Sequence, residues 1–265
     1  MSKIYEALQK AQEEREGVPP LESERVRRRA WFRSRRSRAT NGHRTHGSLR
    51  IDFDLAPDVE EAYQRLGTNL LAPSKDPSVL RDLMVVASVH GEGTTTTAAL
   101  YASTLAKRKK LDVLLIEANF RTPALEQVFP IQRNGGFAEL IAGTQELDRV
   151  VQATPQPNLF VITSGHYETS PSNVLEAPAM SEVLARLHER FQFVVFDSAP
   201  VNVYTDAQIL GPRVDATVFV IEADRTRIDE VQRAKRQLER AGAKMIGVLL
   251  NRRKNYLPGF MEGLI

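Results

Sequence analysis

Three local patterns follow one another in the segment 82-DLMVVASVHGEGTTTTAALYASTLAKRKK-110. An apolar run, DLMVVASV, leads into the glycine-containing stretch HGEG, and a helical pattern with a basic last turn comes next. Glycines allow backbone N–H groups to approach an anion, and the dipole of the following helix favours negative charge. The segment therefore predicts a strand, a turn and a helix that together form an anion-binding loop.

Further apolar runs occur along the chain on both sides of helical patterns, at 111–118, 158–165, 191–198, 215–223 and 244–251. They are continuous in Val, Ile, Leu and Phe and do not alternate with polar residues. Such runs are typical of strands buried on both faces, as in a parallel sheet covered by helices. We therefore predict an α/β fold of the P-loop NTPase type, a three-layer αβα sandwich with a mostly parallel sheet of about seven strands.

The glycine loop departs from the usual phosphate-binding pattern, which reads G-x-x-x-x-G-K-[ST]. When the pattern is aligned on Gly93, Ser88 occupies the first glycine position and Thr94 occupies the lysine position. Thr95 retains the hydroxyl that contacts Mg²⁺ in such loops. Taken by itself, the loop could also be a glycine turn capped by threonine, without a ligand.

Polar residues follow two other predicted strands at the point where each ends. Asp197 ends the run 191–198, and Glu117, Asn119 and Arg121 end or follow the run 111–118. Open α/β sheets build their sites at the carboxyl ends of their strands, so these groups should converge on one crevice. Asp197 is placed as an acid that assists Mg²⁺. Asp206 is either a helix N-cap or an acid that supports the crevice.

Composition limits the remaining possibilities. The 265 residues suit one α/β domain with an extension, and the absence of cysteine excludes disulfides and cysteine-based metal sites. No apolar run reaches the roughly 18 residues that a membrane span requires. The opening MSKIYEALQKAQEER has no apolar signal core. We therefore expect a cytoplasmic protein.

Three parts are predicted along the chain: an amphipathic helix at 1–16, a basic flexible linker at 17–57 and the P-loop domain at 58–265. Ten arginines and no acid lie between Arg25 and Arg50, although the whole chain has a net charge of only +3. The remainder is therefore acidic overall. The linker is either a solvated tether or a contact for an anionic membrane surface, which Trp31 and Phe32 favour slightly. Charge alone would also permit nucleic acid, but no recognition motif supports it.

Several stretches together resemble the bacterial tyrosine kinases of capsule and exopolysaccharide export, which are related to the Min and Par ATPases. They are EEAYQRLGTNLL (60–71), ANFRTPALEQVF (118–129), DSAPVNVYTDAQIL (197–210) and AGAKMIGVLLNR (241–252). The resemblance covers nearly the whole chain. It implies that ATP and Mg²⁺ are bound, that Thr95 and Asp197 serve the metal, and that Arg121 belongs to the site. It also implies that Asn251 reads adenine, and it assigns nucleotide contacts to Gly91, Glu92, Gly93, Thr94, Thr95, Thr96, Asn251 and Arg252. The partner it implies is an inner-membrane polysaccharide co-polymerase, the chain-length determinant, which would bring the protein to the inner face of the plasma membrane.

The departures from the family pattern concern its chemistry. Thr94 replaces the phosphate lysine, and Glu117 and Asn119 replace two aspartates of a D-x-D-x-R motif. The oligomer-forming pattern E-x-x-R-x-x-R aligns with Glu61, Gln64 and Gly67, so both arginines are missing and self-association is left open. The C-terminal tyrosine cluster is reduced to Tyr256, a candidate phosphoacceptor.

Because phosphoryl transfer depends on positioned charges, we favour a regulatory or scaffolding pseudokinase with weak or absent ATP hydrolysis. The first alternative is an active tyrosine autokinase and ATPase to which a lysine from elsewhere contributes. The second is a nucleotide-switched surface ATPase of the partitioning type.

Overall fold

The computed structural model describes residues 57–71, 80–132 and 134–253. Its helices are α2 (Pro57–Leu71), α3 (Thr94–Lys109), α4 (Leu125–Val128), α5 (Phe137–Ala142), α6 (Leu147–Val150), α7 (Pro171–Glu176), α8 (Met180–Arg190), α9 (Asp206–Leu210), a 3₁₀ helix (Gly211–Arg213) and α10 (Ile228–Ala241). The strands are β1 (Asp82–Ala87), β2 (Val113–Glu117), β3 (Gln152–Ala153), β4 (Leu159–Ile162), β5 (Phe193–Asp197), β6 (Ala216–Glu222) and β7 (Met245–Asn251).

The strands form one seven-stranded sheet in the order β3-β4-β2-β5-β1-β6-β7. All neighbouring pairs are parallel except β3 and β4, which are antiparallel. The predicted α/β fold with a mostly parallel sheet is thus confirmed. Each of the six apolar runs contains one strand, whereas β3, only two residues long, was not predicted at a specific position.

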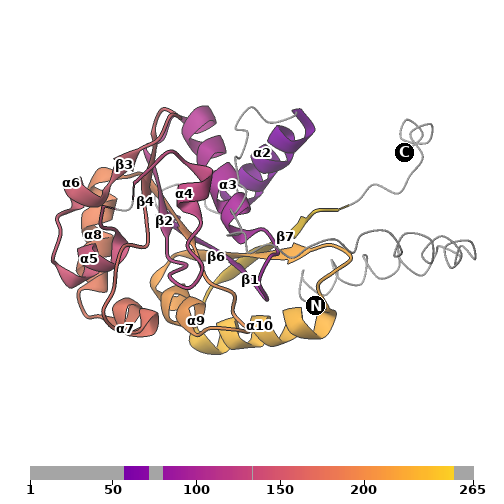
Figure 1. Ribbon diagram of the computed structural model, residues 1–265. Coiled ribbons are helices and arrows are strands. Elements are labelled where there is room, and N and C mark those ends of the chain that lie inside the picture. Colours follow the sequence, from indigo (N-terminus) through magenta and orange to yellow (C-terminus); the bar gives the residue numbers. More distant parts are fainter. Residues whose placement is uncertain (1–56, 72–79, 133, 254–265) are drawn as a thin grey trace, which may run out of the picture. The chain divides into compact units, whose positions relative to one another are not determined.

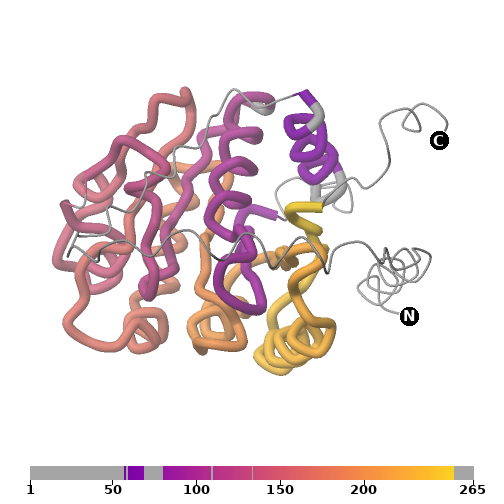
Figure 2. Tube along the Cα trace, turned by 45° about the vertical axis from the view of Figure 1, so that its right-hand side comes forward, coloured from indigo at the N-terminus to yellow at the C-terminus, as the bar shows by residue number. Residues whose placement is uncertain are grey.

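Helices cover both faces of the sheet, as Figures 1 and 2 show, with α2 and α3 on one side and α9 and α10 on the other. Every residue of β1 is buried. Because side chains alternate along a strand, Leu83 and Val85 pack in one cluster with α3, and Met84 and Val86 point to the opposite face. Burial on both faces explains why the runs that contain β1, β2 and β5 lack polar alternation. The run 244–251 differs from the expectation, because β7 lies at the edge of the sheet and is only partly buried.

Helix α3 packs closely on the sheet through small residues. Ala98, Ala99 and Ala102 are fully buried in the cluster that also contains residues of β1, β2 and β5. Helix α2 lies against α3, where Gly67 approaches the side chain of Tyr101. Gly67 therefore lies at the contact between α2 and α3, in the interior of the domain.

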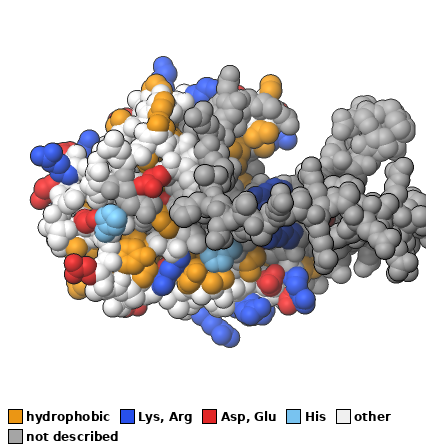
Figure 3. Space-filling model, viewed as in Figure 1, with side chains coloured by type: hydrophobic (Ala, Val, Ile, Leu, Met, Phe, Trp, Pro, Cys, Tyr) orange, Lys and Arg blue, Asp and Glu red, His pale blue; other side chains and the backbone are white. Residues whose placement is uncertain are grey.

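Charged side chains of both signs are mixed on the surface of the described domain. Figure 3 shows blue and red side chains interspersed over the region of α10. Arg227 pairs there with Asp229, and Lys235 pairs with Glu239. The segment 25–50, with ten arginines and no acidic residue, therefore contrasts in composition with this domain.

The predicted helix at 1–16 lies outside the described residues, and so does the predicted linker at 17–57 apart from Pro57, which is the first residue of α2. No helix within the described ranges has the length and apolar character needed to cross a membrane.

Candidate functional site

The turn between β1 and α3 has the backbone of an anion-binding loop. Gly91 and Gly93 adopt φ angles of 88° and 93°, which side-chain-bearing residues rarely adopt. No side chain caps the N-terminus of α3, whose first residue is Thr94. The amides of the first helical turn are therefore without a side-chain acceptor, and the helix dipole favours an anion in front of them.

Strand β5 brings an acid next to the start of α3. The Oγ1 atom of Thr95 donates a hydrogen bond of 2.6 Å to Oδ2 of Asp197. The side chain of Asp197 is fully buried, and its Oδ1 atom has no hydrogen-bond partner within the described part of the chain. Burial raises the pKa of Asp197 to about 8; the bond from Thr95 opposes this increase and the charge of Glu117 adds to it. A nearby cation would stabilise the charged form of this buried carboxyl group and lower its pKa.

Glu117 lies beside Asp197 across the β2–β5 pair, but its carboxylate is engaged by the backbone. Its Oε1 atom accepts hydrogen bonds of 2.5 Å and 2.8 Å from the N–H groups of Ala124 and Leu125. Its Oε2 atom accepts one of 3.0 Å from the N–H of Ser164. Glu117 thus holds the start of α4 and the segment after β4 in place.

Asn119 forms a local turn. Its Oδ1 atom accepts a hydrogen bond from the N–H of Thr122 at 3.2 Å, and its Nδ2 group donates to Oγ1 of Thr122 at 3.1 Å. The residue is 7% exposed. Because an amide does not titrate, Asn119 cannot act as a base.

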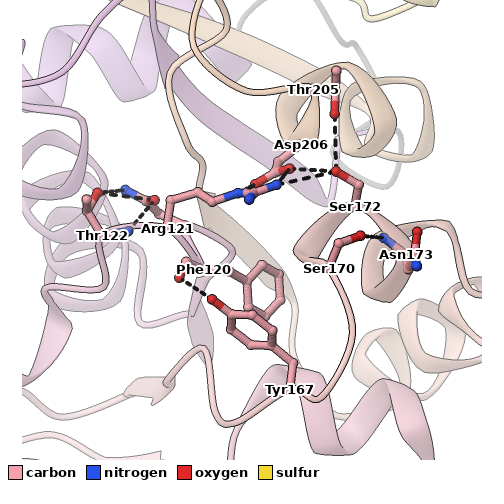
Figure 4. A network of polar contacts seen from close by, with 10 residues as sticks. Phe120, Arg121, Thr122, Tyr167, Ser170, Ser172, Asn173, Thr205 and Asp206 are labelled. Atoms are coloured by element: carbon pink, nitrogen blue, oxygen red, sulfur yellow. Dashed lines mark hydrogen bonds and ion pairs between the residues drawn. The ribbon is translucent and has the colours of Figure 1, made fainter.

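Arg121 forms a bidentate ion pair with Asp206. Its Nε atom lies 3.0 Å from Oδ2 and its NH2 group lies 3.1 Å from Oδ1 of that residue. Figure 4 shows the pair with the hydroxyl of Ser172, which donates to the same carboxylate at 3.1 Å. The guanidinium also lies 4.8 Å from the centre of the Tyr204 ring. Thr205 is the N-cap residue of α9, so Asp206 supports Arg121 and does not cap the helix.

The end of β7 contacts the loop directly. The side-chain amide of Asn251 donates a hydrogen bond of 2.8 Å to the carbonyl of Glu92, and NH1 of Arg252 donates one of 2.9 Å to the carbonyl of Gly91. A Cβ atom on Gly93 would collide with the amide of Asn251. Glycine is thus required at position 93 for space as well as for backbone conformation.

Glu92 is a buried acid inside the loop. Its carboxylate accepts hydrogen bonds of 2.8 Å from the Ser88 hydroxyl and the Val89 N–H. The hydroxyl of Thr226 also donates to it. Glu92 therefore ties the loop to the turn that follows β6, and its side chain fixes the shape of the loop.

The structure brings most of the predicted site residues to one edge of the sheet. The loop residues meet Thr95 and Asp197 on one side, and Asn251 and Arg252 on the other. Tyr256 lies outside the described residues. Within the described ranges, no group of three or more His, Cys, Asp or Glu side chains could hold a metal ion.

Sequence reasoning missed the turn after β6. Arg225 NH1 lies 3.4 Å from the position that a Cβ atom on Gly91 would occupy, and Glu222 pairs with both Arg225 and Arg252. The available signal was positional, since Arg225 follows the carboxyl end of a strand next to β1.

The sheet order, the glycine loop and the acid at the end of β5 define a protein with the fold of P-loop ATPases. No family model matches the chain. It is 31% identical to the tyrosine-protein kinase YwqD of Bacillus subtilis, over 73% of this chain and 81% of that protein. It is also 31% identical to the tyrosine-protein kinase CpsD of Streptococcus pneumoniae, over 76% of this chain and 87% of that one. The chain therefore belongs to the family of bacterial tyrosine-protein kinases.

Solved structures of tyrosine kinase domains have the same fold as this chain. The VpsO kinase domain superposes with a TM-score of 0.67 at 31% identity, covering 74% of this chain and 95% of that one. The kinase domain of the Escherichia coli tyrosine kinase ETK gives a TM-score of 0.71 at 25% identity, covering 84% and 86%. The cell division ATPase MinD of Pyrococcus furiosus shares the fold, with a TM-score of 0.54 at 20% identity over 68% of this chain and 76% of that one.

Proposed function

We propose that this protein is a nucleotide-binding pseudokinase that serves capsule or exopolysaccharide biosynthesis and export as a regulatory or scaffolding subunit. It would bind ATP and Mg²⁺ weakly and transfer the phosphoryl group slowly or not at all. It would act in the cytoplasm, at the inner face of the plasma membrane. Family membership supports the general role, and the altered site supports the inactivity.

The residues present fit a Mg²⁺-bound nucleotide as far as binding is concerned. The loop offers uncapped backbone amides at the start of α3 for phosphate oxygens. The Thr95 hydroxyl and the Oδ1 atom of Asp197, which has no hydrogen-bond partner among the described residues, suit a hard cation. Bound Mg²⁺ would supply charge neutralisation at the phosphates.

The same residues do not fit phosphoryl transfer. The observation that carries this conclusion is the engagement of Glu117 by three backbone N–H groups, which uses its carboxylate for structure. Asn119 is neutral and held in a turn with Thr122. Thr94 lacks the ammonium that would lie against the phosphates. Losing one preorganised charged donor typically slows such reactions about 100- to 1000-fold.

Two measurements test this proposal. Titration calorimetry of the full chain with ATP, with and without Mg²⁺, should show weak binding that strengthens with the metal. Incubation with ATP followed by anti-phosphotyrosine blotting should show no signal above that of Asp197→Asn. Robust tyrosine phosphorylation in the unaltered chain, abolished in this variant, would overturn the pseudokinase assignment.

The names of the relatives favour a second candidate, an active autokinase with an atypical loop. In that case another cation must compensate for Thr94 during transfer. Single-turnover phosphorylation of Tyr256, lost in Tyr256→Phe, would support it. The absence of transfer despite measurable ATP binding would support the pseudokinase.

The proposed partner is an inner-membrane polysaccharide co-polymerase, and residues 1–50 are the segment proposed to reach it or the membrane. Two assays separate these contacts. Co-purification with the co-polymerase should be lost when residues 1–50 are deleted if they form the protein contact. Binding to anionic vesicles that falls when the arginines of Arg25–Arg50 are replaced by glutamine would indicate the lipid contact instead.

A further inference from the structure

A pair of arginines flanks the phosphate loop on the side of β6 and β7. Arg252 NH1 bonds to the carbonyl of Gly91, and Arg225 NH1 lies 3.4 Å from the position of a Cβ atom on Gly91. Both guanidinium groups share the Oε2 atom of Glu222, at 2.8 Å for Arg225 and 3.1 Å for Arg252. The loop that lacks a lysine is thus bordered by two fixed positive charges.

The charge balance of this cluster is positive. Burial would raise the pKa of Glu222, but the hydrogen bonds and charges of Arg252 and Arg225 lower it overall. Glu222 is therefore ionised at neutral pH, and one carboxylate faces two guanidinium groups. The cluster has a net charge of about +1, since arginine stays protonated at any working pH.

Local structure sets the position of Arg225. It lies in the turn after β6, and Thr226 in that turn donates its hydroxyl to the buried carboxylate of Glu92. The same hydroxyl accepts the N–H of Glu222 at 3.2 Å. The turn that carries Arg225 is therefore bonded to the loop.

The guanidinium of Arg225 has N–H groups that no hydrogen bond among the described residues uses. The side chain of Arg225 makes one hydrogen bond among the described residues, to the carboxylate of Glu222, and is 61% exposed. A guanidinium has five N–H groups, so those not used by Glu222 are available to an anion. Arg252, by contrast, also holds the Gly91 carbonyl.

We propose that Arg225 supplies the positive charge that Thr94 lacks, and that it holds the polyphosphate of a nucleotide from the β6–β7 flank of the loop. This inference rests on the proposed nucleotide binding and adds a residue to it. Arg225 approaches the loop at Gly91, whereas the missing lysine belongs at the first residue of α3. A charge displaced in this way strengthens binding without lying at the position that assists transfer, which accounts for a site that binds but does not phosphorylate.

Arg225→Ala tests this assignment in the full chain, with Arg227→Ala as the matched control. Arg227 is two residues further on, and its guanidinium pairs with Asp229. The probes are ATP and inorganic tripolyphosphate, each with Mg²⁺ and followed by calorimetry. Arg225→Ala should weaken both affinities about tenfold, the cost of one charge-assisted contact. Arg227→Ala should change neither more than about twofold, and Arg225→Lys should retain most of the affinity because it keeps the charge.

The results of these titrations distinguish nucleotide binding by the protein from the role of Arg225 in that binding. Unaltered protein that binds neither probe would refute the proposed nucleotide binding, and the role of Arg225 with it. If the unaltered protein binds both probes and Arg225→Ala binds them equally well, only the role of Arg225 is refuted. A loss for ATP but not for tripolyphosphate would place Arg225 against the nucleoside and would likewise overturn the proposal.

Discussion

Glu117 and Asp197 are cross-strand partners at the ends of β2 and β5, and both side chains are fully buried, yet their surroundings differ. Glu117 accepts hydrogen bonds from three backbone N–H groups, whereas Asp197 accepts one from the Thr95 hydroxyl. Hydrogen bonds to a carboxylate stabilise its charged form, and burial without them disfavours it. The two acids therefore have different roles, one structural and one suited to a cation.

Glu117→Gln should lower the free energy of unfolding by about 2–3 kcal/mol. The NH₂ group of glutamine would face at least one of the three backbone N–H groups, and two donors cannot form a hydrogen bond with each other. Urea denaturation measures this change. If Glu117 is structural, the ATP affinity of the folded variant should stay within about threefold of the unaltered protein. Unchanged stability combined with a large loss of Mg²⁺-dependent affinity would instead identify Glu117 as a metal-binding carboxylate.

Stability should depend on pH through Asp197. Its pKa is about 8 in the folded protein and 3.8 ordinarily, so the folded state binds the proton more tightly than the unfolded state. The protonation of Asp197 therefore contributes to the free energy of unfolding. This contribution is complete below the pKa of the unfolded state and is lost as the pH rises towards the pKa of the folded state. In EDTA, raising the pH from about 6 to about 8 should cost about 2 kcal/mol through this group. Asp197→Asn should remove that part of the dependence, and an identical pH profile in the variant would contradict it.

The fold was accessible from sequence because each buried strand has a continuous apolar run, such as Val113–Ile116 in β2. The convergence of Asp197 and Thr95 followed from the parallel arrangement of the strands. The use of Glu117 could not be predicted, because it depends on the chain folding back so that the amides of Ala124 and Leu125 face it. No local pattern encodes that return.

The role of Asp206 and the position of Arg225 also depend on contacts between segments that are distant in sequence. The two interpretations of Asp206 could be separated only by the position of Arg121, which comes from a different strand end. Arg225 lies in an ordinary polar turn, and only the pairing of β6 beside β1 places it near the loop. Contacts between loops of distant sequence depend on strand order, which apolar periodicity does not specify.

Restoring the lysine tests whether the loop still has the geometry for a phosphate. Thr94→Lys should raise Mg²⁺–ATP affinity about tenfold or more through a charge-assisted contact. Adding Asn119→Asp should preserve the turn, because the Thr122 N–H and hydroxyl can both donate to a carboxylate. Thr96→Lys is the comparison: it adds the same charge in the same helical turn, at another expected nucleotide contact that is not the lysine position of the pattern. Equal gains from Thr94→Lys and Thr96→Lys would show a nonspecific charge effect.

The pair of Arg121 and Asp206 should respond asymmetrically to substitution. Asp206 is fully buried, whereas the side chain of Arg121 is 27% exposed. Arg121→Ala leaves a buried carboxylate supported mainly by the Ser172 hydroxyl, and we expect it to cost about 3–5 kcal/mol. Asp206→Asn leaves the arginine stacked on Tyr204 and partly hydrated, so we expect only about 1–2 kcal/mol. Urea unfolding of both single variants and the double variant gives their coupling energy. A larger cost for Asp206→Asn, or strictly additive effects, would mean that burial of Asp206 does not govern this contact.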